Sequence, residues 1–375
     1  MRIGIISTFP LIECGIGTYT SYLVEKLRKL HIEVYIVSQV GAEGEKVYPA
    51  FNATDGDLAE KAFETMIKFT PDVVHIQHEY GLFGKDLGVS IIPLLYKLKF
   101  AGIPVAVTLH SVYEDFSEKQ ALITDAILRI AQAVIVHHDF QRESLRANIR
   151  KEGKVYVIPH GAREVAPVPD AKMKLKVEGK KTILVPGYFR PTKGYDRIIK
   201  MFPDIVREVP NASLIIAGKT RLQEYTDYRD YIFQLVEESA VSDRILVLRG
   251  QFPQKTFDTI ISASDVVPMP YQKGAQSGIM AHCFSFGKPI VASPLKAFAD
   301  TLEKSKAGLI AEKDEEFVAA IVKILNDEKL ARGFSENALR FVKNHVSWRR
   351  IAKETIKVYH EIVVRPYGRA RYVEF

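Results

Sequence analysis

Short apolar runs, rich in β-branched residues, alternate with longer amphipathic stretches along most of the chain. In the first part, the pattern predicts strands at 2–6, 33–37, 73–76, 105–109, 133–136 and 155–158. It predicts helices between them at 18–30, 58–69 and 119–131. Strands that alternate with helices indicate βαβ units, in which helices cover both faces of a parallel sheet.

This alternation stops at Pro159-His160-Gly161 and starts again after a proline-interrupted segment at 166–170. The second series predicts strands at 182–185, 213–217, 245–248, 266–268, 290–292 and 308–310. It predicts helices at 196–208, 222–238, 255–263, 277–286, 315–325, 329–344 and 348–364. We therefore predict an α/β protein with two Rossmann-like, doubly wound domains facing a cleft, where the carboxyl ends of the strands bind a ligand.

The predicted domains are 1–165 and 166–346, followed by a helical segment at 347–375. A length of 375 residues favours two domains, and 47% apolar with 26% charged residues is typical of soluble proteins. The apolar stretch 89–109 is interrupted by Lys97 and Lys99, which argues against a membrane span.

The start of the chain and its cysteines bear on where the protein resides. The opening MRIGIIS is typical of a first strand rather than a signal peptide. Cys14 and Cys283 are the two cysteines, which cannot build a disulfide framework and suit a reducing compartment. We therefore expect a cytoplasmic protein.

The formal net charge of +7 arises from residues 166–375, because acidic residues slightly outnumber basic ones in 1–165. A basic half suits a phosphate-bearing ligand, an anionic membrane surface or nucleic acid, and a solvated lysine-rich surface explains it equally well. The chain has no nucleic-acid-binding motif, so we expect no nucleic-acid partner. Peripheral contact with an anionic membrane stays open.

The segment 187–194, GYFRPTKG, lies between a predicted strand and a predicted helix. Arg190 offers a planar fork and Lys193 a point charge, and both suit phosphate oxygens. Gly187 and Gly194 allow the backbone to approach a ligand closely. We favour an anion site here, with an ordinary surface turn as the alternative.

A second segment, 270–293, also leads from a predicted strand into a predicted helix. Ser277 suits the N-cap of that helix. Alternatively, the backbone N–H groups of Gln276, Ser277 and Gly278 would bind a phosphate. Two anion sites facing one cleft suggest a diphosphate, and hence a nucleotide-linked substrate.

Gly15 and Gly17 follow the first predicted strand and open the first predicted helix, where a bare backbone suits close approach of a ligand. The dinucleotide fingerprint needs a third glycine, which Thr20 replaces, and an acid near Gln39, which the second strand lacks. We therefore do not expect NAD binding, and a plain tight turn is the alternative for this loop.

The segment 72–81, DVVHIQHEYG, places polar residues at a predicted strand and its exit. Strand alternation puts His75, Gln77 and Glu79 on one side and His78 on the other. The order differs from the helical HExxH zinc motif. We favour ligand contacts for His78 and Glu79, with hydrogen-bonded structural roles as the alternative.

Several further histidines follow predicted strands. His110 follows one strand, His137 and His138 follow the next, and His160 ends the domain. A group of such residues at equivalent strand ends favours a site more strongly than any one of them. For His110 alone, capping of the following turn is the alternative.

Taken together, these features resemble the retaining glycosyltransferases of family 4, which have the GT-B fold. The resemblance covers nearly the whole chain, from the Gly15/Gly17 loop through His110, the 158–161 hinge and the Arg190/Lys193 loop to 287–293. The helix that begins near Trp348 is similar to the family's last helix, which returns to the N-terminal domain.

The resemblance implies a role for each matching residue. Arg190 and Lys193 would bind the donor diphosphate and stabilise it as the leaving group, and His110 would contact the transferred sugar. The resemblance further implies donor binding by Gly15, Gly17, Gly187, Gly218, Gln276, Ser277, Gly278 and His282. It implies acceptor-side contacts for His78 and Glu79. In such enzymes the donor phosphate itself is thought to accept the acceptor's proton, so no protein nucleophile is required. Enzymes of this kind usually need no metal, so the resemblance implies no cofactor and no metal.

The chain departs from the family at two positions that are commonly glutamates, here Gly274 and His282. The first usually contacts the donor sugar and the second the ribose, for which His282 retains hydrogen-bonding capacity. We expect a hexosyltransferase, with mannose as the favoured hexose, acting on a sugar or lipid-linked acceptor. The alternatives are a non-catalytic nucleotide-sugar-binding protein and a GT-B epimerase or phosphorylase.

Overall fold

The computed structural model describes residues 1–149, 154–220, 223–274 and 276–363. The end of the predicted last helix, at 364, and position 222 of another predicted helix lie outside these ranges. The chain divides into two compact units. The N-terminal unit comprises Met1–Gly161 together with the chain from Trp348 onward, and the C-terminal unit is Ala162–Ser347.

The N-terminal unit is built on a seven-stranded sheet with the order β3-β2-β1-β4-β5-β6-β7. Every strand pair in it is parallel. The strands are β1 Arg2–Ile6, β2 Glu33–Gln39, β3 Val47–Phe51, β4 Val73–His78, β5 Val105–Leu109, β6 Ala133–Val136 and β7 Val155–Val157. The central strands are largely buried, because helices cover both faces of a parallel sheet.

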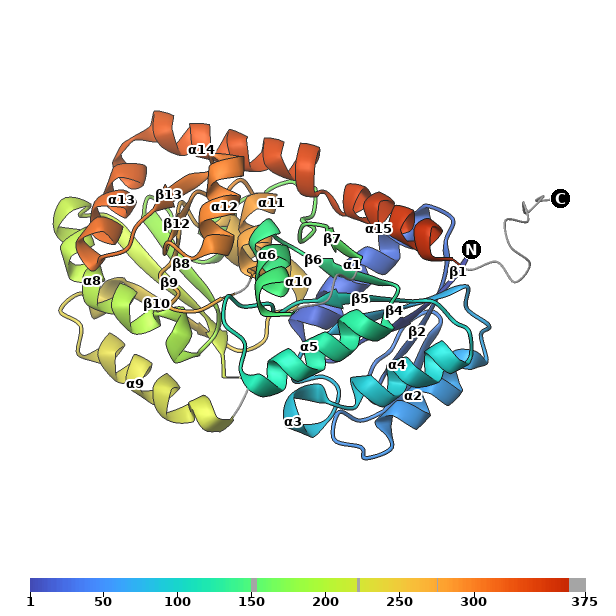
Figure 1. Cartoon of the computed structure of the whole chain (residues 1–375). Coiled ribbons are helices and arrows are strands. Elements are labelled where there is room, and N and C mark those ends of the chain that lie inside the picture. Colours follow the sequence, from blue (N-terminus) through green and yellow to red (C-terminus); the bar gives the residue numbers. More distant parts are fainter. Residues whose placement is uncertain (150–153, 221–222, 275, 364–375) are drawn as a thin grey trace. The chain divides into compact units, whose positions relative to one another are not determined.

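Two groups of helices cover this sheet (Figure 1). They are α1 Gly15–Lys29, α2 Leu58–Ile67, α3 Lys85–Gly88, α4 Ile91–Phe100, α5 Glu118–Ile130, α6 Asp139–Asn148 and α15 Trp348–Ile362. One hydrophobic cluster joins α2, α4 and α5 to the sheet, and another joins α1 and α15 to its other face. The last helix therefore completes the core of the N-terminal unit.

The C-terminal unit has two parallel three-stranded sheets, β10-β9-β8 and β11-β12-β13. A parallel bridge between Ile183 and Val266 links β8 to the start of β11. The strands are β8 Lys181–Tyr188, β9 Ala212–Lys219, β10 Ile245–Arg249, β11 Val267–Met269, β12 Ile290–Ala292 and β13 Gly308–Ile310. The carboxyl ends of these strands therefore lie along one edge.

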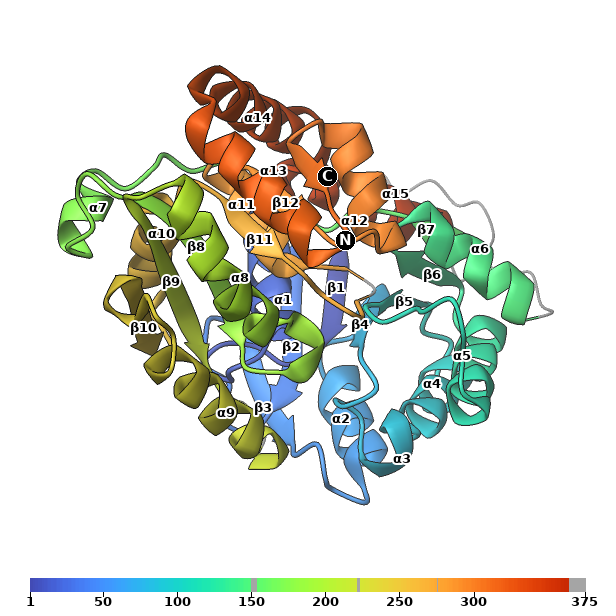
Figure 2. The ribbon, with the colours of Figure 1, turned by 90° about the vertical axis from the view of Figure 1, so that its left-hand side faces the viewer.

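Helices flank the strands of this unit, with α8 beside β8 and β9 (Figure 2). The α-helices are α7 Ala171–Lys174, α8 Tyr195–Glu208, α9 Thr226–Glu237, α10 Gln254–Ser262, α11 Gly278–Ser285, α12 Lys296–Ser305, α13 Asp314–Asn326 and α14 Glu328–Phe341. Short turns are η1 Pro191–Lys193, η2 Gln223–Tyr225, η3 Ser242–Arg244 and the π-turn η4 Val342–Val346. The core joins α8 and α13 to the strands through residues such as Phe202 and Phe317.

The chain passes between the units at two places, near residues 161–162 and near residues 347–348. Backbone pairing and close packing fix the chain at these places. Ala162 donates a backbone hydrogen bond to Val346 at 2.7 Å and forms a bridge with Ser347. A Cβ on Gly161 would overlap the ring of Trp348, so a larger residue does not fit there. The two crossings are thus adjacent in the fold.

The predicted fold class is confirmed: both units are parallel α/β sheets, and the last helix belongs to the N-terminal unit. The sequence pattern gave no explicit prediction for β3, α3, α4, α6, α7 and α12. It predicted one helix at 329–344, where α14 ends at Phe341 and a π-turn follows. β3 contains Pro49 and lies at the sheet edge, where alternation is weak. No helix in the described ranges is long and apolar enough to cross a bilayer.

Candidate functional site

The segments 187–194 and 270–279 meet at the carboxyl-end edge of the C-terminal unit's strands. Gln272 donates its backbone N–H to the carbonyl of Thr192 at 2.9 Å. Gly194 packs against Pro270, and its φ of 68° lies in the left-handed region that favours glycine. The two segments that the sequence singled out separately are thus neighbours.

A pair of glycines lies near the carboxyl ends of β8 and β9 in this region. Gly187 and Gly218 face each other across the β8–β9 pair, and a Cβ on Gly218 would overlap the carbonyl oxygen of Gly187. The hydroxyl of Tyr195 lies 3.6 Å from the position that a Cβ would take at either glycine. Ile279, in the first turn of α11, lies 4.0 Å from that position at Gly187. The bare backbone, the hydroxyl and the helix start therefore lie close together.

Two cations border the glycine pair. The Arg190 guanidinium lies 5.7 Å from the ring centre of Tyr225, and the Lys193 amine lies 3.7 Å from that of Tyr271. Burial, and then the charge of Arg190, lower the pKa of Lys193 to about 7. Among the described residues, neither cation forms an ion pair with a carboxylate.

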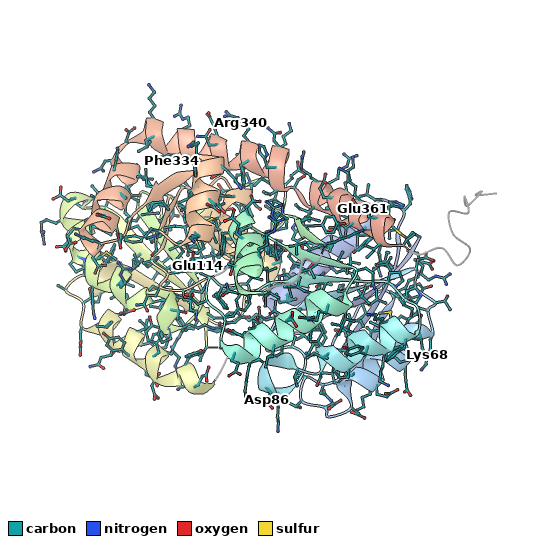
Figure 3. All side chains as sticks on the ribbon, in the orientation of Figure 1. Lys68, Asp86, Glu114, Phe334, Arg340 and Glu361 are labelled. Atoms are coloured by element: carbon teal, nitrogen blue, oxygen red, sulfur yellow. The ribbon has the colours of Figure 1, made fainter. Side chains whose placement is uncertain are left out.

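Charged side chains elsewhere are arranged differently. Asp86 and Arg340 lie at the periphery in Figure 3, and Asp86 pairs with Lys119 at 3.2 Å. Arg197, on the same helix as Tyr195, pairs with Asp314 at 2.6 Å. Unpaired, partly buried cations are costly, because burial removes water and nothing opposite in charge replaces it. An anionic ligand would therefore supply the opposite charge that Arg190 and Lys193 lack among the described residues.

Buried polar atoms without a hydrogen-bond partner among the described residues gather in the same region. They are Arg190 Nε, Tyr195 Oη, Thr220 Oγ1 and Gln276 Oε1. Buried polar atoms in folded proteins are nearly always paired. A polar ligand with both donors and acceptors would satisfy these atoms together.

The start of α11 tests the two interpretations of its first residues. Ser277 is the N-cap, and its hydroxyl accepts a hydrogen bond from the N–H of Met280 at 3.2 Å, as the sequence predicted. Gly278 is the first helical residue, and Gln276 precedes the cap. The capping role of Ser277 is confirmed, and phosphate binding by the adjacent N–H groups stays a prediction.

The two positions that depart from the family pattern lie on either side of this helix start. A Cβ on Gly274 would make ordinary contacts at 3.8 Å with Leu295. The ring of His282 packs edge-on against Phe257, at 5.6 Å between centres. Burial, and then the charge of Arg163, lower the pKa of His282 to about 4, so it is neutral at pH 7.

In the N-terminal unit, Gly15 and Gly17 lie in the first turn of α1, which Cys14 caps. A Cβ on Gly17 would approach the backbone nitrogen of Phe9 to 3.3 Å, whereas one on Gly15 would meet nothing within 4 Å. Gly17 therefore has a packing reason to lack a side chain. Gly15 is exposed and has space around it.

His78 and Glu79 lie at the end of β4, and their surroundings differ. The Nε2 atom of His78 is buried without a partner among the described residues, and burial lowers the pKa of this histidine to about 3. Glu79 accepts hydrogen bonds from the Ser111 hydroxyl at 2.5 Å and from the Tyr80 N–H at 3.1 Å. Of the two, His78 therefore has a buried polar atom without a partner among the described residues, whereas the carboxylate of Glu79 is hydrogen-bonded.

His110 follows β5 and is buried, with 1% of its surface exposed. Its Nε2 lies 2.8 Å from the amide of Gln77, and its Nδ1 lies 3.3 Å from Nε2 of His137. Tyr19 of α1 packs edge-on against its ring. Both ring nitrogens are used inside the unit, so a ring contact with a sugar hydroxyl requires exchange of one of these bonds.

The predicted grouping of strand-end histidines is present for His110, His137 and His160, which surround Tyr19. His138 instead caps α6. In the part of the chain that the structure describes, no group of three histidine, cysteine or acidic side chains could hold a metal ion. The expectation that no metal is required stays a prediction.

The sequence pattern did not predict that aromatic residues belong to the C-terminal site. Tyr195, Tyr225 and Tyr271 lie beside the two cations and the glycine pair. Aromatic faces attract cations, which helps to hold these side chains before an anion binds. The position of Tyr195 directly after Gly194, and of Tyr271 at the start of the second segment, was the available signal.

Two family models match the chain over most of its length. Residues 169–341 match the model described as "Glycosyl transferases group 1", and residues 14–163 match "Glycosyltransferase Family 4". A phosphatidyl-myo-inositol mannosyltransferase of Mycolicibacterium smegmatis is 26% identical over 210 residues, 55% of this chain and 51% of the relative. An uncharacterized glycosyltransferase of Methanocaldococcus jannaschii is 23% identical over 198 residues, 52% of this chain and 48% of the relative. The chain spans about half the length of these curated relatives.

Solved structures resemble the chain over nearly its whole length. Sucrose-phosphate synthase of Thermosynechococcus elongatus has a TM-score of 0.78 at 20% identity, covering 96% of this chain and 98% of its own. Anabaena HepE in complex with UDP-glucose has a TM-score of 0.76 at 15% identity, covering 96% and 100%. At these identities the likeness establishes the fold.

Proposed function

The chain belongs to the family 4 glycosyltransferases, and we propose that it transfers a hexose from a nucleotide-diphosphate sugar to a sugar or lipid-linked acceptor with retention of configuration. Mannose is the favoured hexose in this proposal. One similar relative is named a mannosyltransferase, and one structural neighbour was solved with UDP-glucose.

The observation that carries the proposal is the C-terminal site. Arg190 and Lys193 lack carboxylate partners among the described residues and stand beside the bare backbone of Gly187 and Gly218. A diphosphate would supply the opposite charge, and the sugar hydroxyls and ribose would supply partners for the unpaired polar atoms nearby.

The proposed reaction uses these cations at the leaving group. The bond between the sugar's anomeric carbon and the diphosphate oxygen breaks, and the acceptor oxygen forms its bond to the same face of that carbon. The acceptor's proton passes to the departing phosphate oxygen. Arg190 and Lys193 stabilise the negative charge that develops on the diphosphate, which lowers the barrier most where the site is partly shielded from water.

Lys193 would also take up a proton when the donor binds. With a pKa of about 7, the amine is only partly protonated near neutral pH in the free protein. A bound diphosphate would raise that pKa, because a nearby opposite charge favours the protonated form. Donor binding would thus draw a proton onto Lys193 before the sugar–phosphate bond breaks.

The double variant Arg190→Ala/Lys193→Ala tests the proposal. We expect it to lose at least about 100-fold in affinity for nucleoside diphosphates, because each removed charged hydrogen bond is worth about 1.5–3 kcal/mol. Calorimetry with GDP, UDP and ADP measures this affinity, and the panel identifies the base. Product anomers, resolved by proton NMR, test retention.

Arg207→Ala is the matched control, because Arg207 lies on α8, outside the 187–194 loop, is exposed and pairs with Asp204. It should bind and transfer like the unaltered protein. Unchanged transfer by the double variant would overturn the proposed site.

A non-catalytic binding protein remains the second candidate, favoured by Gly274, which presents no side chain to a donor sugar. It predicts thermal stabilisation by nucleotide sugars, with neither transfer nor slow donor hydrolysis in any acceptor screen. The first candidate predicts both stabilisation and turnover.

Cytoplasmic localisation with peripheral contact to anionic membrane belongs to the same proposal, motivated by the basic residues of 166–375. Sedimentation with vesicles containing phosphatidylglycerol should deplete the protein at low salt, and vesicles of phosphatidylcholine alone should not. Equal recovery with both vesicles would remove the membrane from the proposal.

A further inference from the structure

A chain of buried side chains runs through the N-terminal unit from the last helix to the end of β7. Tyr359 of α15 lies 2.7 Å from Nδ1 of His75, and Thr108 of β5 lies 2.8 Å from Nε2 of the same ring. The amide of Gln77 bridges His75 Nε2 at 3.2 Å and His110 Nε2 at 2.8 Å. His110 Nδ1 then meets His137 Nε2 at 3.3 Å, and His137 Nδ1 meets the carbonyl of Ile158 at 3.0 Å.

The far end of this chain fixes where hydrogens lie. The Ile158 carbonyl only accepts, so His137 Nδ1 must carry a hydrogen. In a neutral ring, His137 Nε2 is then an acceptor, and His110 Nδ1 must donate to it. His110 Nε2 therefore lacks a hydrogen when both rings are neutral, and it needs a donor from Gln77.

The amide of Gln77 presents its oxygen, not its nitrogen, to His110. In that orientation His110 Nε2 must carry the hydrogen, which leaves two acceptors facing each other between His110 and His137 unless the pair holds one extra proton. Turning the amide by 180° presents its nitrogen to His110 instead. All bonds are then made with neutral rings, and they run in one direction from Tyr359 to Ile158.

The other end of the chain accepts either arrangement. The hydroxyls of Tyr359 and Thr108 can each donate or accept, so His75 finds partners in both of its tautomers. The two states therefore differ in the orientation of the Gln77 amide, in the tautomer of His75 and by one proton on the His110–His137 pair.

We propose that Gln77 is a two-position positioning residue, whose amide orientation is coupled to whether the His110–His137 pair holds one extra proton. The neutral state, with the hydrogen of His110 on Nδ1, is the state at neutral pH. The protonated state, with the amide oxygen toward His110, is reached by taking a proton from solvent.

The surroundings favour the neutral state near pH 7. The titratable groups that face the pair are Tyr19 from α1, His75 and His78 from β4, and His160 after β7. None of these stabilises an imidazolium with a negative charge at that pH. Burial lowers the pKa of His137 to about 4 and that of His110 well below its ordinary value.

The switch connects distant parts of the unit. Tyr359 belongs to the last helix, and Ile158 directly precedes the Pro159-His160-Gly161 crossing. A change in the last helix at Tyr359 therefore reaches His110 through the amide of Gln77. The consequence for sugar transfer rests on the proposed function, whereas the proton arrangement does not.

Ring nitrogen NMR of protein labelled with ¹⁵N-histidine tests the proposal from pH 4.5 to 8. In the unaltered protein we expect His110 and His137 to be neutral at pH 7.5 with hydrogens on Nδ1. In Gln77→Glu, a carboxylate accepts from both neighbours and favours the imidazolium, which should raise the pKa of the pair by about 1–3 pH units. Tyr359→Phe removes the partner of His75 Nδ1 in both states and should change the same pKa by less.

Gln132→Glu is the matched control, since its side chain accepts from the Val105 N–H at the start of β5, away from the histidines. Its ring spectra should equal those of the unaltered protein. A neutral His110 with hydrogen on Nε2 at pH 7.5, or ring spectra that neither Gln77→Glu nor Tyr359→Phe changes, would overturn the proposal.

If transfer is measured, the acid limb of kcat/KM should move upward in Gln77→Glu by the pKa shift seen in the spectra. Lack of transfer in the unaltered protein as well as in the variants would count against the proposed function and leave the spectral result standing.

Discussion

The two units carry polar residues at the carboxyl ends of parallel strands, yet they treat them in opposite ways. In the N-terminal unit, His75, Gln77 and His110 are buried, uncharged at pH 7 and bonded to one another. In the C-terminal unit, the Arg190 guanidinium and the partly protonated Lys193 amine have no carboxylate partner among the described residues.

This difference separates a region whose buried side chains are largely uncharged and bonded to one another from one whose cations have no carboxylate partner among the described residues. A satisfied buried network stabilises one arrangement of its side chains, whereas unpaired cations and unpaired buried atoms lose free energy until a ligand binds. The same architecture therefore carries a hydrogen-bonded network in one unit and a candidate anion site in the other.

The largest expected effect is acid destabilisation of the N-terminal unit. Burial lowers the pKa of His75 to about 3 and that of His137 to about 4, while the unfolded chain titrates near 6.5. The unfolded chain therefore binds more protons below about pH 6.5, and stability falls as pH decreases toward the folded pKa values. Each histidine contributes about 1.4 kcal/mol per pH unit to this loss.

Urea unfolding at pH 7.5, 6.0 and 5.0 measures this loss of unfolding free energy. Fluorescence of Trp348, the single tryptophan, is the probe of the N-terminal unit. His137→Gln should reduce the pH dependence, and His360→Gln, at an exposed position of α15, should not. An unfolding free energy that is constant across this range would contradict the comparison.

Next in size is Gly218→Ala in the C-terminal site. Its Cβ would overlap the carbonyl of Gly187, so we expect a loss of about 1–3 kcal/mol in stability together with weaker diphosphate binding. Gly333→Ala in α14 is the control, because a Cβ there meets nothing within 4 Å and should add about 0.5–1 kcal/mol. Thermal unfolding compares the two, and equal behaviour would show that the glycine pair is not tightly packed.

The protonation of Lys193 should change the affinity for a diphosphate by about tenfold per pH unit above pH 7. Because its pKa is about 7 in the free protein, binding of an anion above pH 7 must add a proton, and affinity should fall as pH rises. Lys193→Arg should flatten this dependence, since arginine stays charged. Calorimetry of UDP or GDP at pH 8 in buffers of different ionisation enthalpy measures the proton uptake.

Lys200→Arg, on α8 and outside the 187–194 loop, should keep the pH dependence of the unaltered protein. If the unaltered protein binds the diphosphate with no proton uptake at pH 8, Lys193 does not contact the phosphates.

The smallest effect separates the two interpretations of Ser277. As the N-cap of α11, its removal in Ser277→Ala should cost about 1 kcal/mol and leave diphosphate affinity nearly unchanged. Asp327→Ala, which removes the cap of α14, should cost a similar amount. A selective loss of affinity in Ser277→Ala would mean that its hydroxyl binds the ligand.

Much of the fold followed from local pattern, and much of the site did not. The βα alternation predicted parallel sheets in both units, because the spacing of apolar residues within each segment distinguishes a strand from a helix. The edge strand β3 was not predicted because it contains Pro49. The π-turn after α14 was not predicted because its residues continue the apolar spacing of a helix. The glycines and cations of 187–194 were visible as a strand-to-helix loop, but the tyrosines that hold them were not.

The sequence by itself determined the order of the elements, the two-unit organisation of parallel sheets and the residue types available at the strand ends. Only the tertiary structure decided which of these residues are satisfied. Tyr359 meets His75 across 284 residues of sequence, and the two loops at 187–194 and 270–279 become neighbours when the strands align. Hydrogen bonding and desolvation depend on distances in space, which a linear pattern of apolar and polar positions does not contain.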